Sequence, residues 1–413
     1  MPVSVRPYTH RRADPSIHWP AAASAEAAHP TTGFGRDQRL DTLRGYMLVA
    51  IALNHLDTEL RVFSDYVFGF VSTAEGFVFL SGLVAGLVYT RRASGRPPGE
   101  LRRNAWRRAG QIYGAHVSSF VIALVGLLLM AFVTNTVSPT SPALFFSHPS
   151  EALTMGLALL YQPGLFDILP MYCGFMLALP LILGALRRGY AARLFAVSGG
   201  LWLLSQAGLR DALQRWLSSF TPVNLGAFDI LAWQLFFVIG VYFGYHWAKG
   251  TRPLLSFRPA LLLLCLAIAV PLWLVLKYQQ PLLPVGLNMD MVWRWADKTH
   301  LAPLRLLNFI VLAYLIAAVA VHFPRLVAFR PLAFIGRHSL VVFSFQVTVC
   351  AFLLTQPYLF HSFASRTLTA VGLIALLFPA AWVHQKLSDR RRRAAPAGSV
   401  MSLPRGEVLK EVA

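Results

Sequence analysis

Ten apolar stretches constrain the fold of this chain more strongly than any other feature of its sequence. A helix needs about 20 residues to cross the hydrocarbon core of a bilayer. Hydrophobic residues make up 56% of the chain and charged residues only 13%, whereas about a quarter of the residues in soluble domains are charged. The sequence therefore predicts an all-α, polytopic membrane protein with about ten transmembrane helices, at residues 40–60, 74–90, 109–134, 169–186, 194–206, 228–247, 259–277, 303–322, 338–356 and 367–386.

The basic residues predict how these helices are oriented. The formal net charge of +19 is gathered in short loops rather than on one basic face, which argues against a nucleic-acid partner. Loops rich in Lys and Arg stay in the cytoplasm, so both termini are expected there, close to membrane lipid. The intervening loops, such as 134–150 and 277–295, are rich in proline, polar or aromatic residues and are expected outside. The basic loops are 91–108, 187–193, 249–258, 325–337 and 386–393.

Three segments are predicted along the chain. Residues 1–35 are rich in Ala, Pro, His and Thr and have no apolar core, which predicts a disordered cytoplasmic tail rather than a signal peptide. Residues 36–388 form the membrane domain, and residues 389–413 form a basic, flexible cytoplasmic tail. The three cysteines lie in apolar stretches and are too few for a disulfide framework.

Two ionisable residues frame the first apolar stretch. Arg44 lies at its cytoplasmic edge, and His55 lies roughly 16 Å further along the helix axis, in the outer half of the bilayer. The next helix begins outside with Glu75, so His55 and Glu75 are expected to meet at similar depth. A carboxylate that holds one imidazole nitrogen prepares the other for general-base catalysis, and Asn54 could hold an oxyanion or the substrate. The alternative is a buried pair that only fastens two helices.

More polar residues are predicted at the outer level, at the starts of three later helices. Asp229 and His300 lie in these segments. Together the polar groups predict an outward-facing cavity whose candidate substrate-binding residues are Asp167, Tyr172, Gln234 and Arg305. Taken singly, each is also typical of a capping or snorkelling side chain, and both interpretations stay open.

At the inner level, the loop from Arg91 to Arg108 carries seven arginines and one acid. Arginine at this density suits the phosphate groups of a nucleotide-like donor, although it also sets topology and attracts anionic lipid. Arg107 and Arg108, at the entrance of the third helix, are the stronger candidates. A second inner cluster, FIGRHSLVVFSFQV, contributes Arg337 and His338, with Gln346 further along.

Other motifs lend no support to several chemistries. His384 and Asp389 have the His-x4-Asp spacing of soluble glycerolipid acyltransferases, but they lie at the cytoplasmic end of the last helix and run into four arginines, which disfavours catalysis there. The chain has no Walker loop, dinucleotide-binding fingerprint, Gly-x-Ser-x-Gly elbow or cysteine-pair zinc pattern. Phosphoryl transfer, hydride transfer, serine hydrolysis and a metal site therefore have no motif to support them.

Seven segments, taken in order, resemble the OpgC family over about residues 36–386. The resemblance implies a multi-pass enzyme of the bacterial inner membrane that attaches succinyl groups to osmoregulated periplasmic glucans. The segments are RLDTLRGYMLVAIALNHL, FGFVSTAEGFVFLSGLVAGLVY, RRNAWRRAGQIYGAHV, ILPMYCGFMLALP, LAWQLFFVIGVYFGY, APLRLLNFIVLAYL and PLAFIGRHSLVVFSFQV.

The OpgC family is in turn similar to the wider membrane acyltransferase superfamily. The first span of that superfamily carries arginine, ten residues and then histidine, which Arg44 and His55 match. Its second span carries an aromatic-rich stretch ending in Ser-Gly, matched by Phe77, Phe79, Ser81 and Gly82. Family members often have Asp-His-Ile-Pro where this chain has Asn54, His55, Leu56 and Asp57. Glu75 is therefore expected to take over the acidic role.

The resemblance implies acyl transfer across the membrane. The donor substrate is expected to be an acyl-CoA, namely succinyl-CoA, with no permanently bound cofactor. His55 would take the proton from a sugar hydroxyl or form an acyl-histidine intermediate, and Arg305 would pair with the free succinyl carboxylate. The alternatives are a transporter or flippase of a glycan or lipid-linked substrate, and acetylation of another envelope polysaccharide. The residues expected to hold the acyl-CoA are Arg44, Arg107, Arg108, Arg337 and His338.

Overall fold

The computed structural model describes most of the predicted membrane domain. The chain divides into two units, Met1–Asp37 and Gln38–Ala413, and the helices that the structure describes belong to the second unit. The tail predicted at 1–35 lies outside the described residues, as do Asp57, Arg96 and residues 395–413. The described residues are 37–56, 58–93, 97–138, 140–251, 257–279, 283 and 288–394.

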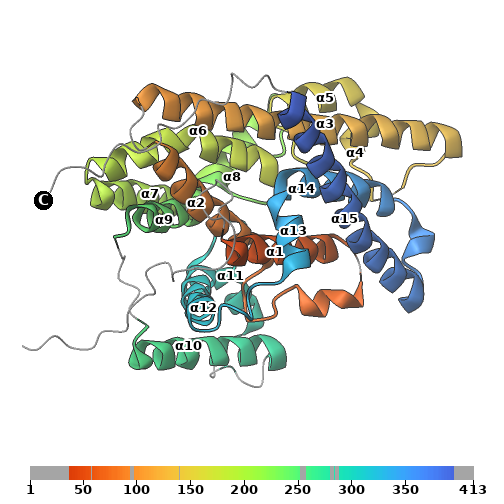
Figure 1. Cartoon of the computed structure of the whole chain (residues 1–413). Coiled ribbons are helices and arrows are strands. Elements are labelled where there is room, and N and C mark those ends of the chain that lie inside the picture. The colour runs from red at the N-terminus through yellow and green to blue at the C-terminus, as the bar shows by residue number, and fades with distance from the viewer. Residues whose placement is uncertain are drawn as a thin grey trace, which may run out of the picture. The chain divides into compact units, whose positions relative to one another are not determined.

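Helices account for all of the regular secondary structure in these ranges, as Figure 1 shows, and this confirms the predicted all-α fold. Two short 3-10 helices, η1 (Glu59–Phe63) and η3 (Pro357–Leu359), lie in connecting segments. The α-helices are α1 (Gln38–His55), α2 (Thr73–Arg92), α3 (Pro98–Thr134), α4 (Ala143–Ser147), α5 (Pro149–Leu157), α6 (Ile168–Arg187), α7 (Ala191–Gln206), α8 (Leu209–Ser218), α9 (Ile230–Lys249), α10 (Pro259–Tyr278), α11 (Met289–Trp295), α12 (Pro303–His322), α13 (Arg330–Arg337), α14 (Ser339–Leu353) and α15 (Phe363–Ala394).

Each of the ten predicted stretches is helical, but fewer of them are long and apolar enough to cross a membrane. Within the described residues, seven helices meet that condition, or eight if the bent pair α13 and α14 is one span. Three charged residues interrupt α1, namely Arg39, Asp41 and Arg44, and α7 and α14 have only 16 and 15 residues. At its far end, α15 runs past the predicted boundary at 388 to Ala394.

Glycines allow α2 and α9 to pack with their backbones in close contact. A Cβ atom on Gly82 or Gly86 would lie 2.3 or 2.4 Å from a carbonyl oxygen of α9, and one on Gly240 or Gly244 would lie 2.2 or 2.1 Å from a carbonyl oxygen of α2. Each helix thus presents two glycines four residues apart, the small-xxx-small pattern that brings membrane helices together. We call this contact, made by Gly82, Gly86, Gly240 and Gly244, the glycine seam. It holds α2 against α9 and so positions Glu75, which lies in the first turn of α2.

A second glycine contact joins α1 to α13. A Cβ on Gly45 would lie 1.9 Å from the carbonyl oxygen of Leu332, and one on Gly336 would lie 1.9 Å from that of Asp41. After this contact the chain bends by 86° between α13 and α14. The bend places Ser339, the first residue of α14, beside Arg44.

Contacts between helix ends define two opposite ends of the helical unit. At the first, which we call the Glu75 end, Glu75 pairs with Arg305, and the backbone N–H of Asp229 donates to the carbonyl of Thr299. At the second, the Arg44 end, α1 begins against α13 and α14. Because Ser339 lies beside Arg44, while Cys350 and Leu353 pack near Leu53, α1 and α14 run in the same direction.

The glycine seam predicts a sharp difference between two Gly→Ala variants. Gly240→Ala is expected to lower the stability of the protein by about 1–3 kcal/mol, because the new methyl group overlaps the backbone of α2. A Cβ on Gly199, in α7, would meet no atom of the other described parts of the chain within 4 Å, so Gly199→Ala is expected to be neutral or stabilising by about 0.5–1 kcal/mol. Thermal unfolding in detergent, followed by circular dichroism, measures both. Equal melting temperatures would contradict the close packing.

Candidate functional site

A buried ion pair is the strongest polar contact at the Glu75 end. Glu75 Oε1 lies 2.6 Å from Arg305 Nη1, and the two side chains are 0% and 1% exposed. Further hydrogen bonds complete the pair: Ser72 Oγ donates to Glu75 Oε2 at 2.6 Å, and Arg305 Nε donates to the carbonyl of Ala296 at 2.8 Å. A buried pair tolerates its loss of hydration only when its remaining polar atoms are satisfied in this way.

This ion pair corrects two expectations. No hydrogen bond or ion pair joins His55 to Glu75 in the part of the chain that the structure describes, because Arg305 and Ser72 occupy the two carboxylate oxygens. Arg305 is also not a free cation, since Glu75 balances its charge and the side chain is buried. It is therefore not available to bind a succinyl carboxylate. The sequence showed both charges but not which partners they would find.

His55 is the last residue of α1, and its Nδ1 atom is buried without a hydrogen-bond partner among the described residues. Asn54 beside it is held more firmly. Its Oδ1 accepts from Ser64 Oγ at 2.6 Å, and its Nδ2 donates to the Ser64 carbonyl and to Thr73 Oγ1 at 3.5 Å. A buried ring nitrogen without a partner requires an explanation in a ligand or a water. His55 is therefore the residue at this end best suited to meet a substrate.

The other candidate substrate-binding residues lie near this end but are engaged in packing. The carboxylate of Asp167 accepts from the backbone N–H of Ala227 at 3.0 Å. Burial raises the pKa of this carboxyl above its ordinary value, while that hydrogen bond opposes the rise. The amide of Gln234 is bonded to Ser198 through both of its polar atoms. Tyr172 packs edge-on against Phe237, with ring centroids 6.1 Å apart.

At the Arg44 end, basic side chains from four helices come close together. Arg44 donates to Ser339 Oγ, and Arg337 lies 3.6 Å from Asp41. The Nδ1 atoms of His338 and His384 are 2.8 Å apart. The charges of Arg108 and Arg391 also act on His384. His384 thus has a structural partner in His338, and its position needs no catalytic role for the His-x4-Asp spacing.

Arg107 and Arg108 differ in how they are held on α3. Arg107 is exposed, whereas Arg108 is partly buried and donates to Gln111 Oε1 at 3.1 Å. Neither charge is neutralised by a carboxylate in the ion pairs of the described residues. Both therefore remain suited to an anionic group that approaches this end.

Two fully buried polar side chains lie between the ends. Gln346, on α14, is 0% exposed, and neither its Nε2 nor its Oε1 has a hydrogen-bond partner in the described part of the chain. His116, on α3, is 1% exposed, and both of its ring nitrogens are in the same situation. The sequence analysis did not single out His116, although a histidine within a long apolar helix is a candidate functional residue.

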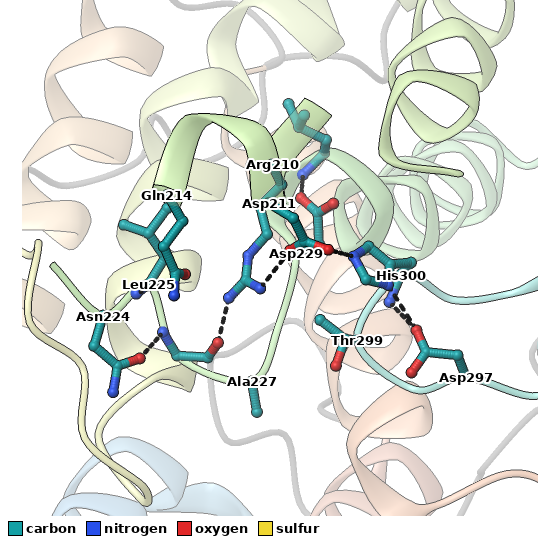
Figure 2. A network of polar contacts seen from close by, with 12 residues as sticks. Arg210, Asp211, Gln214, Asn224, Leu225, Ala227, Asp229, Asp297, Thr299 and His300 are labelled. Atoms are coloured by element: carbon teal, nitrogen blue, oxygen red, sulfur yellow. Dashed lines mark hydrogen bonds and ion pairs between the residues drawn. The ribbon is translucent and has the colours of Figure 1, made fainter. Parts of the chain in front are cut away.

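A cavity of about 650 Å³ also opens near the Glu75 end. Figure 2 shows part of its wall, where His300 lies between Asp297 and Asp211. None of the predicted substrate-binding residues lines it. Sequence reasoning singled out His300 but missed the others, because they come from connecting segments and short helices that only the fold brings together. The lining residues are Ser205, Gln206, Gly208, Asp211, Asp290, Trp293, Arg294, Asp297, His300 and Ala302.

The buried ion pair predicts a large effect of removing one charge. Glu75→Gln is expected to destabilise the protein by about 3–5 kcal/mol, because it leaves Arg305 buried without a counter-ion. Asp65→Asn is the matched control, since Asp65 pairs with the exposed Arg61 at 3.0 Å, and exposed pairs contribute about 0–1 kcal/mol. Denaturant unfolding of both variants in detergent measures the difference. A Glu75→Gln variant as stable as Asp65→Asn would contradict the buried pair.

The comparisons with known proteins agree with the resemblance in the sequence. The family described as OpgC protein matches residues 36–389, which is most of the chain. In the searches of curated proteins and of solved structures, nothing matches significantly. The family match supports a transferase with a role in glucan modification, and the apolar helices indicate a membrane protein. The chain belongs to the OpgC family.

Proposed function

We propose that this protein transfers a succinyl group from a cytoplasmic acyl-CoA to a hydroxyl of a periplasmic glucan, in the bacterial inner membrane. The observation that carries the proposal is the position of His55. Its Nδ1 is buried at the end of α1 and has no hydrogen-bond partner among the residues that the structure describes, and Arg44 lies near the opposite end of the same helix. One helix thus joins a candidate base to a candidate phosphate-binding cluster.

In the reaction, His55 accepts the proton of the attacking sugar hydroxyl. The sugar oxygen forms a bond to the carbonyl carbon of the thioester, and the carbon–sulfur bond then breaks. The proton passes from the imidazolium to the departing thiolate, so the histidine returns to its neutral form. The longer amide contacts of Asn54 Nδ2, at 3.5 Å, suit a donor that turns toward the oxyanion as it develops.

Glu75 has a different part in this scheme from the one that the sequence predicted. It holds Arg305, and through Arg305 the backbone at Ala296. The pair therefore positions the segments around His55 rather than orienting the imidazole itself. Recognition of the succinyl carboxylate is left to groups other than Arg305.

The donor is held at the Arg44 end by its phosphate groups. Arg107, Arg108, Arg337 and His338 lie there on α3, α13 and the bend that follows α13, and guanidinium groups bind phosphates strongly through charge-assisted hydrogen bonds. Gln346 lies seven residues beyond Ser339 on α14, roughly 10 Å along the axis. Its unpartnered amide suits an acyl–pantetheine arm that extends from this end toward His55.

A carrier is the second candidate, because one observation favours it. The pair α13 and α14 is bent by 86°, and interrupted helices line the substrate paths of many transporters. Transporter folds generally carry such helices in corresponding positions of two repeats. The described residues contain a single bent pair, so the acyltransferase remains the stronger proposal.

His55→Ala is expected to abolish succinylation, because removal of a general base costs about 10²–10⁴-fold in rate. Mass spectrometry of periplasmic glucans, from a deletion strain complemented with each variant, measures the succinyl content. His361→Ala is the matched control, since His361 is exposed in a connecting segment, and it should restore wild-type content. Normal succinylation by a folded, membrane-inserted His55→Ala protein would exclude His55 as the base. Glucans unchanged by the deletion itself would favour the carrier.

The donor site predicts a change in KM rather than in stability. Replacing Arg107 and Arg108 by alanine is expected to raise the KM for succinyl-CoA about tenfold or more, because each lost charge-assisted hydrogen bond costs about 1.5–3 kcal/mol. The control replaces Arg187 and Arg188, an exposed pair of arginines at the end of α6. Initial rates in proteoliposomes, at two salt concentrations, give KM for each. The same KM in both double variants would contradict the assignment.

A further inference from the structure

The cavity beside His300 has the size and opening of a small-molecule site. Its volume of about 650 Å³ falls within the range of about 300–1,000 Å³ that such sites occupy. Trp293, on its wall, is 39% exposed, so the space is open to molecules from outside. The wall comes from the end of α7, the start of α8, the helix α11 and the segment before α12.

Hydrogen bonds and ion pairs hold several side chains of the cavity wall in place. Asp297 accepts from the Nδ1 atom of His300 at 2.8 Å, and Asp211 lies 3.2 Å from Nε2 on the other side of the ring. Asp211 also pairs with Arg210, which donates in turn to the carbonyl of Gly226 (Figure 2). Gln206 donates to the carbonyl of His300 at 2.6 Å. These bonds fix the polar groups before any ligand arrives, which lowers the entropy cost of binding.

One buried group on the wall has no partner. Ser205 is 1% exposed, and its hydroxyl makes no hydrogen bond with any described residue. A serine inside a helix normally bonds to the carbonyl four residues earlier when nothing else is available. A buried hydroxyl that is left unsatisfied costs about 1–3 kcal/mol. Its place on the cavity wall indicates a ligand atom that completes its hydrogen bonding.

The charges of the wall decide which class of ligand fits. Three carboxylates, Asp211, Asp290 and Asp297, face the space together with Arg294 and His300. This balance disfavours an anionic ligand such as a CoA phosphate or a succinate. It also offers no metal site, since no group of three or more potential ligands that could hold an ion occurs in the described residues. Carboxylates that accept hydrogen bonds, beside an indole ring, suit a neutral polyol whose C–H faces stack on the aromatic surface.

The cavity adjoins the buried ion pair. Ala296, which accepts from Arg305, follows α11 directly and precedes Asp297. Trp293 packs edge-on against Tyr66 and Phe70, with ring centroids 5.6 and 5.3 Å apart. Lys298, in the same segment, lies close enough to His55 for their charges to interact. A ligand in the cavity is thus one short segment away from the proposed base.

We infer that this cavity binds glucose units of the acceptor glucan, and that Ser205, Asp290 and Trp293 form its sugar-binding surface. The inference rests on the proposed function and deepens it, because it assigns a binding site for the acceptor away from the donor end. In this arrangement Trp293 stacks against a sugar ring, Asp290 accepts from sugar hydroxyls, and Ser205 bonds to another sugar hydroxyl.

Binding of neutral gluco-oligosaccharides to the purified, full-length protein in nanodiscs tests the inference. Isothermal titration calorimetry would use β-1,2-, β-1,3- and β-1,4-linked oligomers of equal length. Wild type is expected to bind at least one of them, and Ser205→Ala to weaken that binding about threefold or more, as expected for one lost hydrogen bond. The same variant should be as stable as wild type or more so, because the Ser205 hydroxyl has no hydrogen-bond partner among the described residues.

Two matched controls separate binding from folding. Ser198→Ala, on the same helix, removes a buried hydroxyl that donates to Gln234 at 2.7 Å; it should lower stability and leave oligosaccharide affinity unchanged. Trp293→Phe should weaken binding severalfold, whereas Trp295→Phe, on the same helix but outside the cavity, should not. Equal affinities in the members of either pair, or no binding of any oligomer by wild type, would overturn the inference.

These outcomes remain distinct from a failure of the proposed function. Succinylation of glucans in cells is measured separately, by mass spectrometry. If glucans are succinylated normally while Ser205→Ala and Trp293→Phe bind oligosaccharides like wild type, the cavity is not the acceptor site and the transferase stands. If wild type binds oligosaccharides in the cavity but no succinyl group depends on the protein, the sugar site stands and the transferase proposal fails.

Discussion

The pairing of Glu75 with Arg305 organises the end of the molecule where the proposed chemistry occurs. Each charge alone would be costly in so buried a place, and the hydrogen bonds to Ser72 and to the backbone of Ala296 help to offset the loss of hydration of the pair. The pair therefore holds three separate parts of the chain in one arrangement: the start of α2, the start of α12 and the segment after α11. The segment after α11 lines the cavity beside His300 and carries Lys298, which lies near His55.

Close backbone packing positions α2, one of the two helices that carry the pair. The glycines of α2 and α9 bring these helices within reach of each other's carbonyl groups, and the start of α2 then faces the start of α12. At the Arg44 end, Gly45 and Gly336 allow α1 and α13 to pack equally closely, because each faces a backbone carbonyl of the other helix. Without a water-driven hydrophobic effect between membrane helices, such close packing is a main source of their association. These glycines thus help to position charged side chains elsewhere on the same helices, such as Glu75 on α2.

The two ends differ in charge, and this difference suits the proposed transfer between two compartments. Basic groups from α1, α3, α13 and α15 gather at the Arg44 end, whereas three carboxylates, one arginine and one histidine line the cavity near the Glu75 end. An anionic donor and a neutral, hydroxyl-rich acceptor would each meet the end that suits it. The parallel helices α1 and α14 connect these ends, and the unpartnered amide of Gln346 lies on the way.

Local sequence was sufficient for some of these features and not for others. Apolar length and composition determined the all-α membrane fold and the positions of ten helices, because a helix satisfies its own backbone and its period can be read along the chain. The order of seven segments determined the family. Within the described residues, seven helices, or eight if α13 and α14 form one span, are long and apolar enough to cross a membrane, because charged residues in α1 and the shortness of α7 and α14 matter as much as apolar character. Only the tertiary structure decided that Glu75 binds Arg305 rather than His55, and that residues from α7, α8, α11 and the segment before α12 enclose a cavity. Both depend on contacts between distant parts of the chain, and no spacing within a single helix encodes which partner a buried charge will meet.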